Sequence, residues 1–190
     1  RILLDGIDLR DYDLQGLRDA VGVIFQDYVK YHLTAEENIA VGCIEERYNK
    51  IRIREAAKKS SANKVIENLP DGYKQIIGRW FKTGTNLSGG EWQKIAIARV
   101  YMREAKLLIL DEPTAALDAR AEHEIFRKFL ELTNDKCAVL ISHRFSTVRM
   151  ANRIIVLHEG RLIEEGTHDE LLIAKGQYSE LFYMQSEGFR

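Results

Sequence analysis

The sequence predicts an α/β fold with a mostly parallel sheet and helices on both of its faces. Three short apolar runs, at residues 107–110, 138–141 and 154–157, alternate with helix-forming segments. Strands that are apolar at every position, rather than at every second one, are typical of parallel sheets that are covered on both sides. We therefore expect all three runs to be buried strands of one sheet.

The composition is that of one globular domain without a global charge. The 190 residues are 45% hydrophobic, and 28 Lys and Arg against 29 Asp and Glu leave a net charge of −1. This excludes disorder and the basic field of a nucleic-acid-binding protein. Every apolar run is shorter than the roughly 18 residues of a membrane helix. Cys43 and Cys137 form no C-x-x-C pair, which excludes a zinc knuckle and fits a reducing compartment.

The first 25 residues predict a hairpin, a helix and a strand. Asp5-Gly6 follows an apolar run and is a strong hairpin signal. Asp13 is a plausible N-cap for a short helix through Leu14 and Leu17. Residues 21–25 then form an apolar strand.

Residues 26–105 are predicted to be mainly helical. Thr34 and Glu37 have the spacing of a capping box. The helix-prone segment 47–68 is interrupted near Ser60-Ser61 and is closed by a turn at Pro70-Asp71-Gly72. A last helix, from Gly89 to Glu104, has one apolar face, formed by Trp92, Ile95, Ala98 and Met102.

The C-terminal part alternates strand and helix. We expect a helix over Asp118–Thr133 and a short one near Thr147–Ala151. Glu159-Gly160 predicts an antiparallel hairpin. Thr167 and Glu170 repeat the capping-box spacing before a final helix.

Polar side chains follow three of the predicted strands. Asp111 and Glu112 end one, and Gln26 and His143 each follow another. Ligands of open α/β sheets bind at the carboxyl ends of the strands. Each residue alone also fits a plainer reading: a solvated acidic turn, a surface glutamine, a structural histidine. The other histidines are read as structural, and no metal site is assigned from protein ligands alone: His32, His123, His158 and His168.

A glycine-rich turn opens the helix that begins at Gly89. Glycines at Gly89 and Gly90 let a phosphate approach the backbone, and unpaired amides at a helix start attract anions. This predicts a γ-phosphate clamp that includes Ser88. The alternative is an ordinary turn in which Ser88 only caps the helix.

In this order, the motifs resemble an ABC-transporter nucleotide-binding domain: Gln26, Leu87-Ser88-Gly89-Gly90, Leu107–Glu112 with Ala116-Leu117-Asp118, and His143. The resemblance covers nearly the whole chain, and residues 142–172 resemble the exporter-type branch. It implies a P-loop NTPase-like core, at residues 1–26 and 105–190, and an ABC helical subdomain with the signature motif, at residues 27–104.

The resemblance implies catalytic roles for Gln26, Glu112 and His143, and a Mg²⁺-binding role for Asp111. Gln26 is the Q-loop glutamine and Asp111 the Walker B aspartate, both directed to Mg²⁺. Glu112 polarises the water that attacks ATP, and His143 contacts the γ-phosphate. Such positioning and charge neutralisation is what phosphoryl transfer requires.

The resemblance also implies partners. Ser88, Gly89 and Gly90 are the signature loop, which binds ATP held by a second nucleotide-binding domain, identical or not. Asp118 lies in the D-loop at that dimer interface. A transmembrane domain is the other partner, so we expect the cytoplasmic face of the cell membrane. No nucleic-acid partner is expected.

The phosphate-binding loop G-x-x-x-x-G-K-[ST] is absent, since no Gly of the 190 residues precedes a Lys. The family has this loop upstream of the strand at which Arg1 stands. We therefore expect an N-terminally truncated domain with an incomplete core that exposes apolar surface at residues 21–25 and 107–110. We also expect that the chain alone neither binds ATP tightly nor hydrolyses it.

Two other functions stay open. A soluble ABC ATPase that acts on DNA or ribosomes tends to carry coiled-coil or basic insertions, and residues 26–87 show neither. A non-catalytic partner half would lend only its signature loop, but Glu112 and His143 argue against a degenerate site.

The sequence departs from the family pattern in two places. Many relatives have Gln followed by Arg or Lys where this chain has Glu91-Trp92-Gln93. Residues 78–84 replace a segment that is acidic in exporters and that faces the transmembrane domain.

Overall fold

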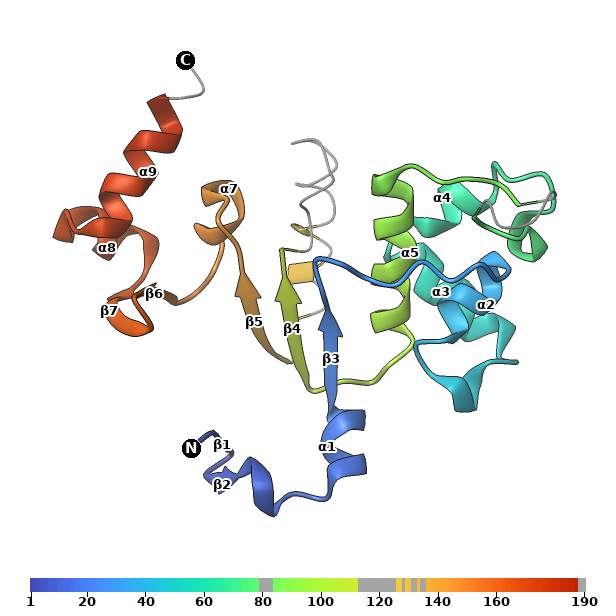
Figure 1. The fold of residues 1–190 in the computed structure, drawn as a ribbon, viewed down its shortest axis with the longest axis horizontal. Coiled ribbons are helices and arrows are strands. Elements are labelled where there is room, and N and C mark those ends of the chain that lie inside the picture. The colour runs from blue at the N-terminus through green and yellow to red at the C-terminus, as the bar shows by residue number, and fades with distance from the viewer. Residues whose placement is uncertain (79–83, 113–125, 128, 131–132, 134–135, 188–190) are drawn as a thin grey trace. The chain divides into compact units, whose positions relative to one another are not determined.

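The computed structural model describes residues 1–78, 84–112, 126–127, 129–130, 133 and 136–187 (Figure 1). The chain divides into a first unit, residues 1–141, and a second unit, residues 142–190. The predicted α/β class is confirmed, with a parallel sheet and flanking helices in the first unit.

The first unit is built on a three-stranded parallel sheet. Its strands, in the spatial order β3-β4-β5, are β3 (Val21–Ile24), β4 (Leu107–Asp111) and β5 (Cys137–Ile141). Val21 pairs with Leu107, and Leu107 pairs with Cys137, so the three strands start level. Their carboxyl ends therefore meet at one edge, where Gln26 and Glu112 follow.

The segment before the sheet forms as predicted. β1 (Leu3–Leu4) and β2 (Ile7–Asp8) are an antiparallel pair. Their turn places both Asp5 and Gly6 at positive φ, the geometry of a tight hairpin. A single 3-10 turn, Leu9–Asp11, leads to α1 (Leu14–Ala20). The Asp13 carboxylate accepts a hydrogen bond from the Gly16 amide at 2.7 Å and so caps α1.

The middle segment is a helical layer beside β3 (Figure 1). Its helices are α2 (Ala35–Ala40), η2 (Ile44–Glu46), α3 (Lys50–Lys59), α4 (Ala62–Ile66), η3 (Gly72–Lys74) and α5 (Gly89–Tyr101). The predicted interruption separates α3 from α4, because Ser61 has a left-handed backbone. The capping box of Thr34 and Glu37 is confirmed.

Helix α5 is the central element of this layer. It packs against α2, α3 and α4 on one side and against β3 on the other. The four apolar positions predicted for its face are all buried. They join a core cluster that extends through α2, α3 and α4. A second cluster joins α5 to the sheet through Ile97, Val100, Leu108 and Leu110.

In its described residues, the second unit contains a hairpin and three helices. Its elements are α7 (Phe145–Val148), β6 (Ile154–His158), β7 (Arg161–Gly166), α8 (His168–Ala174) and α9 (Gln177–Glu187). The Glu159-Gly160 turn and the Thr167–Glu170 capping box are both confirmed. Ile154, Leu171 and Tyr178 form its small core.

Strand β6 was expected in the parallel sheet. It lies in the second unit, where it pairs with β7 in antiparallel fashion through the tight turn at Glu159 and Gly160. Its place in the parallel sheet of the first unit stays a prediction.

The predicted burial of the strands on both faces is wrong for β5. Val139 and Ile141 are 46% and 51% exposed. β4 is the central strand, and its Leu108 and Leu110 are buried in a cluster with α5, whereas β5 is an edge strand among the described residues. Of the residues expected to expose apolar surface, Phe25 is exposed, whereas Leu107 and Ile109 are half-buried.

The helix expected over Asp118–Thr133 lies largely outside the described residues, as do Ala116, Leu117 and Asp118 themselves. Within the described ranges, no helix combines the length and the apolar character needed to span a bilayer.

Candidate functional site

The carboxyl ends of β3 and β4 open into a hollow of about 380 Å³. Gln26 follows β3, Glu112 follows β4, and Gly89 begins α5. We call this the carboxyl-end hollow, and its lining residues are Phe25, Gln26, Asp27, Tyr28, Lys30, Gly89, Gln93 and Glu112. The structure thus brings together three of the residues singled out in the sequence, although they are up to 86 positions apart.

Glu112 has a constrained backbone at the edge of this hollow. Its φ is +44°, a left-handed value that side chains other than Gly, Asn or Asp rarely adopt. Its amide donates to the Ile141 carbonyl at 3.0 Å, which extends the β4–β5 ladder by one residue. Non-glycine residues held in such conformations cost about 1–3 kcal/mol and cluster at functional sites.

The start of α5 is fixed by a reciprocal cap. The Ser88 hydroxyl accepts a hydrogen bond from the Glu91 amide at 3.3 Å, and the Ser88 amide donates to the Glu91 carboxylate at 2.8 Å. The Ser88 hydroxyl also donates to that carboxylate, at 2.8 Å. Ser88 is therefore an N-cap, and Glu91 completes the capping box. The part of Ser88 in a γ-phosphate clamp stays a prediction.

The cap leaves two amides of the first turn for another acceptor. The Trp92 amide bonds the Ser88 carbonyl at 3.0 Å, and the amides of Ser88 and Glu91 serve the cap. Gly89 and Gly90 lie between them, and in the described residues no acceptor bonds their amides. Two glycine amides at the start of a 13-residue helix suit an anionic oxygen.

Tyr28 ties the segment after β3 to the start of α5. Its hydroxyl donates to the Gly89 carbonyl at 3.0 Å. Burial raises the pKa of Tyr28 above its ordinary value, so the hydroxyl stays protonated and remains a donor at neutral pH. This bond fixes one wall of the hollow against the helix.

Arg99 of α5 holds the same segment through hydrogen bonds to backbone carbonyls. Its guanidinium donates to the Val29 carbonyl at 2.6 Å, to the Asn38 carbonyl at 2.9 Å and to the Asn38 side chain at 2.8 Å. It also lies over the Tyr31 ring, 4.9 Å from its centre. Burial lowers the pKa of Arg99 to about 10, so it remains a cation at neutral pH. Sequence analysis missed this residue, because it reads as one more polar position of a helix.

Gln93 is a second residue that sequence analysis did not assign. It is 2% exposed and lines the hollow four positions after Gly89, on the same face of α5. Its side-chain oxygen has no hydrogen-bond donor among the described residues. The i, i+4 spacing from Gly89 was the available signal.

Asp111 and Gln26 were predicted to hold Mg²⁺, and this stays a prediction. Gln26 lies on the lining of the hollow, whereas Asp111 is half-buried at the end of β4 and is not one of the lining residues. No cluster of three or more His, Cys, Asp or Glu occurs within the described ranges. One carboxylate and one amide oxygen fit Mg²⁺, which keeps several waters and takes substrate phosphates rather than a full protein cage.

His143 lies in the second unit, directly before α7. Its carbonyl accepts a hydrogen bond from the Gln185 side chain at 2.8 Å, which links it to α9. It also lines a mainly apolar hollow of about 530 Å³ with Phe145, Tyr178 and Met184. The approach of His143 to Glu112 stays a prediction.

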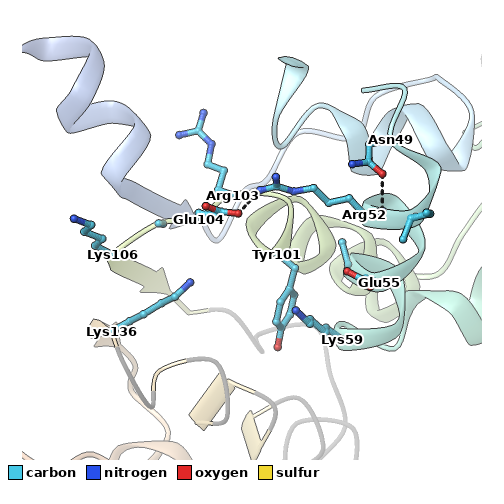
Figure 2. Close-up of a pocket in the computed structure, with 12 residues that line it drawn as sticks. Asn49, Arg52, Glu55, Lys59, Tyr101, Arg103, Glu104, Lys106 and Lys136 are labelled. Carbon is cyan, nitrogen blue, oxygen red and sulfur yellow. Dashed lines mark hydrogen bonds and ion pairs between the residues drawn. The ribbon is translucent and has the colours of Figure 1, made fainter. Parts of the chain in front are cut away.

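The first unit has a larger hollow, of about 580 Å³, at the amino ends of β4 and β5. Figure 2 shows this amino-end hollow, in which Arg52 points toward Glu104 while Lys106 and Lys136 lie across from α3. Arg52 donates to the Met102 carbonyl at 2.7 Å, and Arg103 donates to the carbonyls of Gly42, Arg18 and Val21. The guanidinium groups of both arginines therefore bond carbonyls of the surrounding backbone, and none of the predicted site residues lines this hollow.

The chain matches the family model described as ABC transporter over residues 1–115. It is 41% identical over 171 residues, 90% of this chain, to the subtilin transport ATP-binding protein SpaT of Bacillus subtilis. It is 42% identical over 188 residues, 97% of this chain, to the ATP-dependent lipid A-core flippase of Syntrophus aciditrophicus (strain SB). The chain covers 28% and 30% of these relatives, less than a third of each.

A solved structure is similar over nearly the whole chain. It is a bacterial Atm1-family ABC exporter with ATP bound, with a TM-score of 0.87 and 36% identity. The alignment covers 96% of this chain and 31% of that one.

Proposed function

Because this chain belongs to the ABC transporter family, as an exporter-type ATP-binding domain, we propose that it forms the ATP-hydrolysing part of an exporter. The observation that carries the proposal is the shared hollow of Gln26, Gly89 and Glu112. A strand-end carboxylate, a strand-end amide and unpaired helix amides are the groups that phosphoryl transfer to water requires.

Glu112 is the proposed general base. Its carboxylate orients a water molecule, whose oxygen attacks the γ-phosphorus of ATP. The bond between that phosphorus and the bridging oxygen of ADP breaks, and the water proton passes to Glu112. A positioned base contributes roughly 10²–10⁴ in rate. The fixed φ of Glu112 restricts the directions from which its carboxylate can act.

Magnesium would be held by Gln26 and Asp111, and it would neutralise the phosphate oxygens when bound. His143 would contact the γ-phosphate of the same ATP that Glu112 and the magnesium ion act on. Gly89 and Gly90, with Ser88, would donate to a γ-phosphate oxygen of ATP held by a second nucleotide-binding domain. We therefore propose a dimer, of identical or different domains, with Asp118 at its interface.

The transport partner is a transmembrane domain, and the site of action is the cytoplasmic face of the membrane. Two of these relatives are named after a transported molecule, which is subtilin in one and lipid A-core in the other. For this chain we propose export without assigning the molecule that is carried.

The 190 residues alone are proposed to be inactive. They contain no G-x-x-x-x-G-K-[ST] loop, whose amides and lysine hold the β- and γ-phosphates. We call an assembly in which this chain works together with such a loop and a membrane domain the intact exporter.

The test compares Glu112→Gln with Glu104→Gln in the intact exporter. Both variants exchange a carboxylate for an amide, but Glu104 belongs to the amino-end hollow. We expect Glu112→Gln to lower ATP turnover roughly 10²–10⁴-fold and Glu104→Gln to leave it unchanged. Equal effects of the two variants, or ATP turnover by the 190-residue chain alone, would contradict the proposal.

A further inference from the structure

The carboxyl-end hollow contains a buried acceptor that no described residue satisfies. The side-chain oxygen of Gln93 lacks a donor, and the residue is 2% exposed. Buried polar groups nearly always find a partner, and one that does not calls for an explanation such as a functional role or a bound water. The acceptor thus marks a place where a donor binds.

The neighbouring side chains limit what this donor can be. The Tyr28 hydroxyl already donates to the Gly89 carbonyl, so it is not free for Gln93. Glu112 lines the same hollow, and in the role proposed for it as a general base its carboxylate accepts hydrogen bonds. A molecule that donates to the Gln93 oxygen and also to the Glu112 carboxylate would bridge the two side chains. Water does so, and a polar hollow of about 380 Å³ has room for it.

We propose that Gln93 is a positioning residue for the water molecule that Glu112 activates. Its oxygen accepts one hydrogen of a water molecule, and the Glu112 carboxylate accepts the other. The inference rests on the proposed function, and it adds a residue from the body of α5. Because Gly89 lies one turn earlier on that helix, the signature loop and the water of the same chain share one rigid element.

The experiment replaces Gln93 with Met in the intact exporter. Methionine has a similar length and no strong acceptor, so it removes the hydrogen bond while filling the space. We expect kcat for ATP hydrolysis to fall roughly tenfold, the size of one lost hydrogen bond in the transition state. We expect KM for ATP to change less than twofold. The thermal midpoint should stay the same or rise, because a buried oxygen without a donor among the described residues is removed.

Gln75→Met is the matched control. Gln75 is also buried in the first unit, but its side-chain amide donates to the Ile76 carbonyl at 3.1 Å, away from the hollow. This variant should lower the thermal midpoint and leave kcat unchanged. Gln93→Met is therefore expected to lower kcat without lowering the thermal midpoint, and Gln75→Met to do the reverse. A general packing defect would not separate the two variants in this way.

A double variant separates this inference from the proposed function. If Glu112 and Gln93 act through one water molecule, Gln93→Met should cause no further loss of kcat in a Glu112→Gln background. If Glu112→Gln lowers turnover but Gln93→Met leaves kcat unchanged, the inference is wrong and the proposed function stands. A fall in kcat together with the thermal midpoint would also overturn it. If Glu112→Gln has no effect, the proposed function itself fails.

Discussion

Two hollows lie at opposite ends of one parallel sheet, and they differ in how their polar groups are used. In the amino-end hollow, Arg52 and Arg103 donate to carbonyls of the surrounding walls. In the carboxyl-end hollow, the Gln93 oxygen and the amides of Gly89 and Gly90 have no partner among the described residues. The first arrangement holds the fold together, whereas the second leaves bonds for a ligand.

The candidate site is not in the larger of these two hollows. The amino-end hollow is the larger, at about 580 Å³ against about 380 Å³. What marks the smaller one is a positive φ at Glu112 and a buried acceptor without a donor. Hydrogen-bonding capacity that remains unused is therefore the better guide to the site in this protein.

The largest loss of stability is expected for a substitution of Arg99, which holds the segment after β3 beside the carboxyl-end hollow. Arg99→Lys keeps the charge but cannot bond Val29 and both oxygens of Asn38 together. We expect a loss of about 3 kcal/mol in the free energy of unfolding and lower ATP turnover in the intact exporter. Denaturation curves and turnover rates measure the two effects. A stability loss without a change in turnover would break the link between this wall and the site.

Arg52→Lys tests the other hollow in the same way. Arg52 bonds the Met102 carbonyl at the end of α5 and pairs with Glu104 at 3.5 Å. The lysine should cost about 1.5 kcal/mol of stability, and turnover per folded molecule should not change. Altered kinetics in a stable Arg52→Lys protein would show that the amino-end hollow has a functional role.

Glu91→Gln sharpens the comparison at the edge of the carboxyl-end hollow. Gln can still cap Ser88, but it removes a negative charge beside two amides proposed to bind phosphate. Relief of about 1 kcal/mol of repulsion should lower KM for ATP about fivefold in the intact exporter. A KM that rises or stays the same would mean that Glu91 does not face the nucleotide.

The smallest effect is expected for the Thr34 cap of α2, which lines neither hollow and so shows what the loss of a local hydrogen bond costs on its own. Hydrogen bonds from the Thr34 hydroxyl and amide lower the pKa of Glu37 below its ordinary value of 4.5. A carboxyl group with a lowered pKa in the folded state stabilises the protein above its unfolded pKa and loses that contribution as the pH falls through the folded value. Thr34→Ala should cost about 1 kcal/mol at pH 7, and the difference should shrink below pH 4.5. Denaturation at several pH values measures it, and a pH-independent difference would contradict the assignment.

Local features of the fold could be predicted because the residues that decide them lie within a few positions of one another. The Asp5-Gly6 turn, the break at Ser60-Ser61 and the cap at Ser88 all form as predicted. The burial of β5 was predicted wrongly, because it depends on elements distant in the sequence.

The candidate site divides in the same way. Gln26 and Glu112 could be found because strand ends are visible in the apolar pattern, and parallel strands bring their ends together. Gln93 could not, since a polar residue inside a helix gives no sign that its oxygen lacks a donor until the surrounding hollow is known.

The central claim is that the carboxyl-end hollow binds nucleotide and the amino-end hollow does not. Backbone amide hydrogen exchange in the intact exporter, with and without ATP and Mg²⁺, tests it most directly. The account predicts slower exchange at residues 25–28 and 88–90 on ATP addition and no change at residues 103–106. Protection at residues 103–106 with none at residues 88–90 would contradict it.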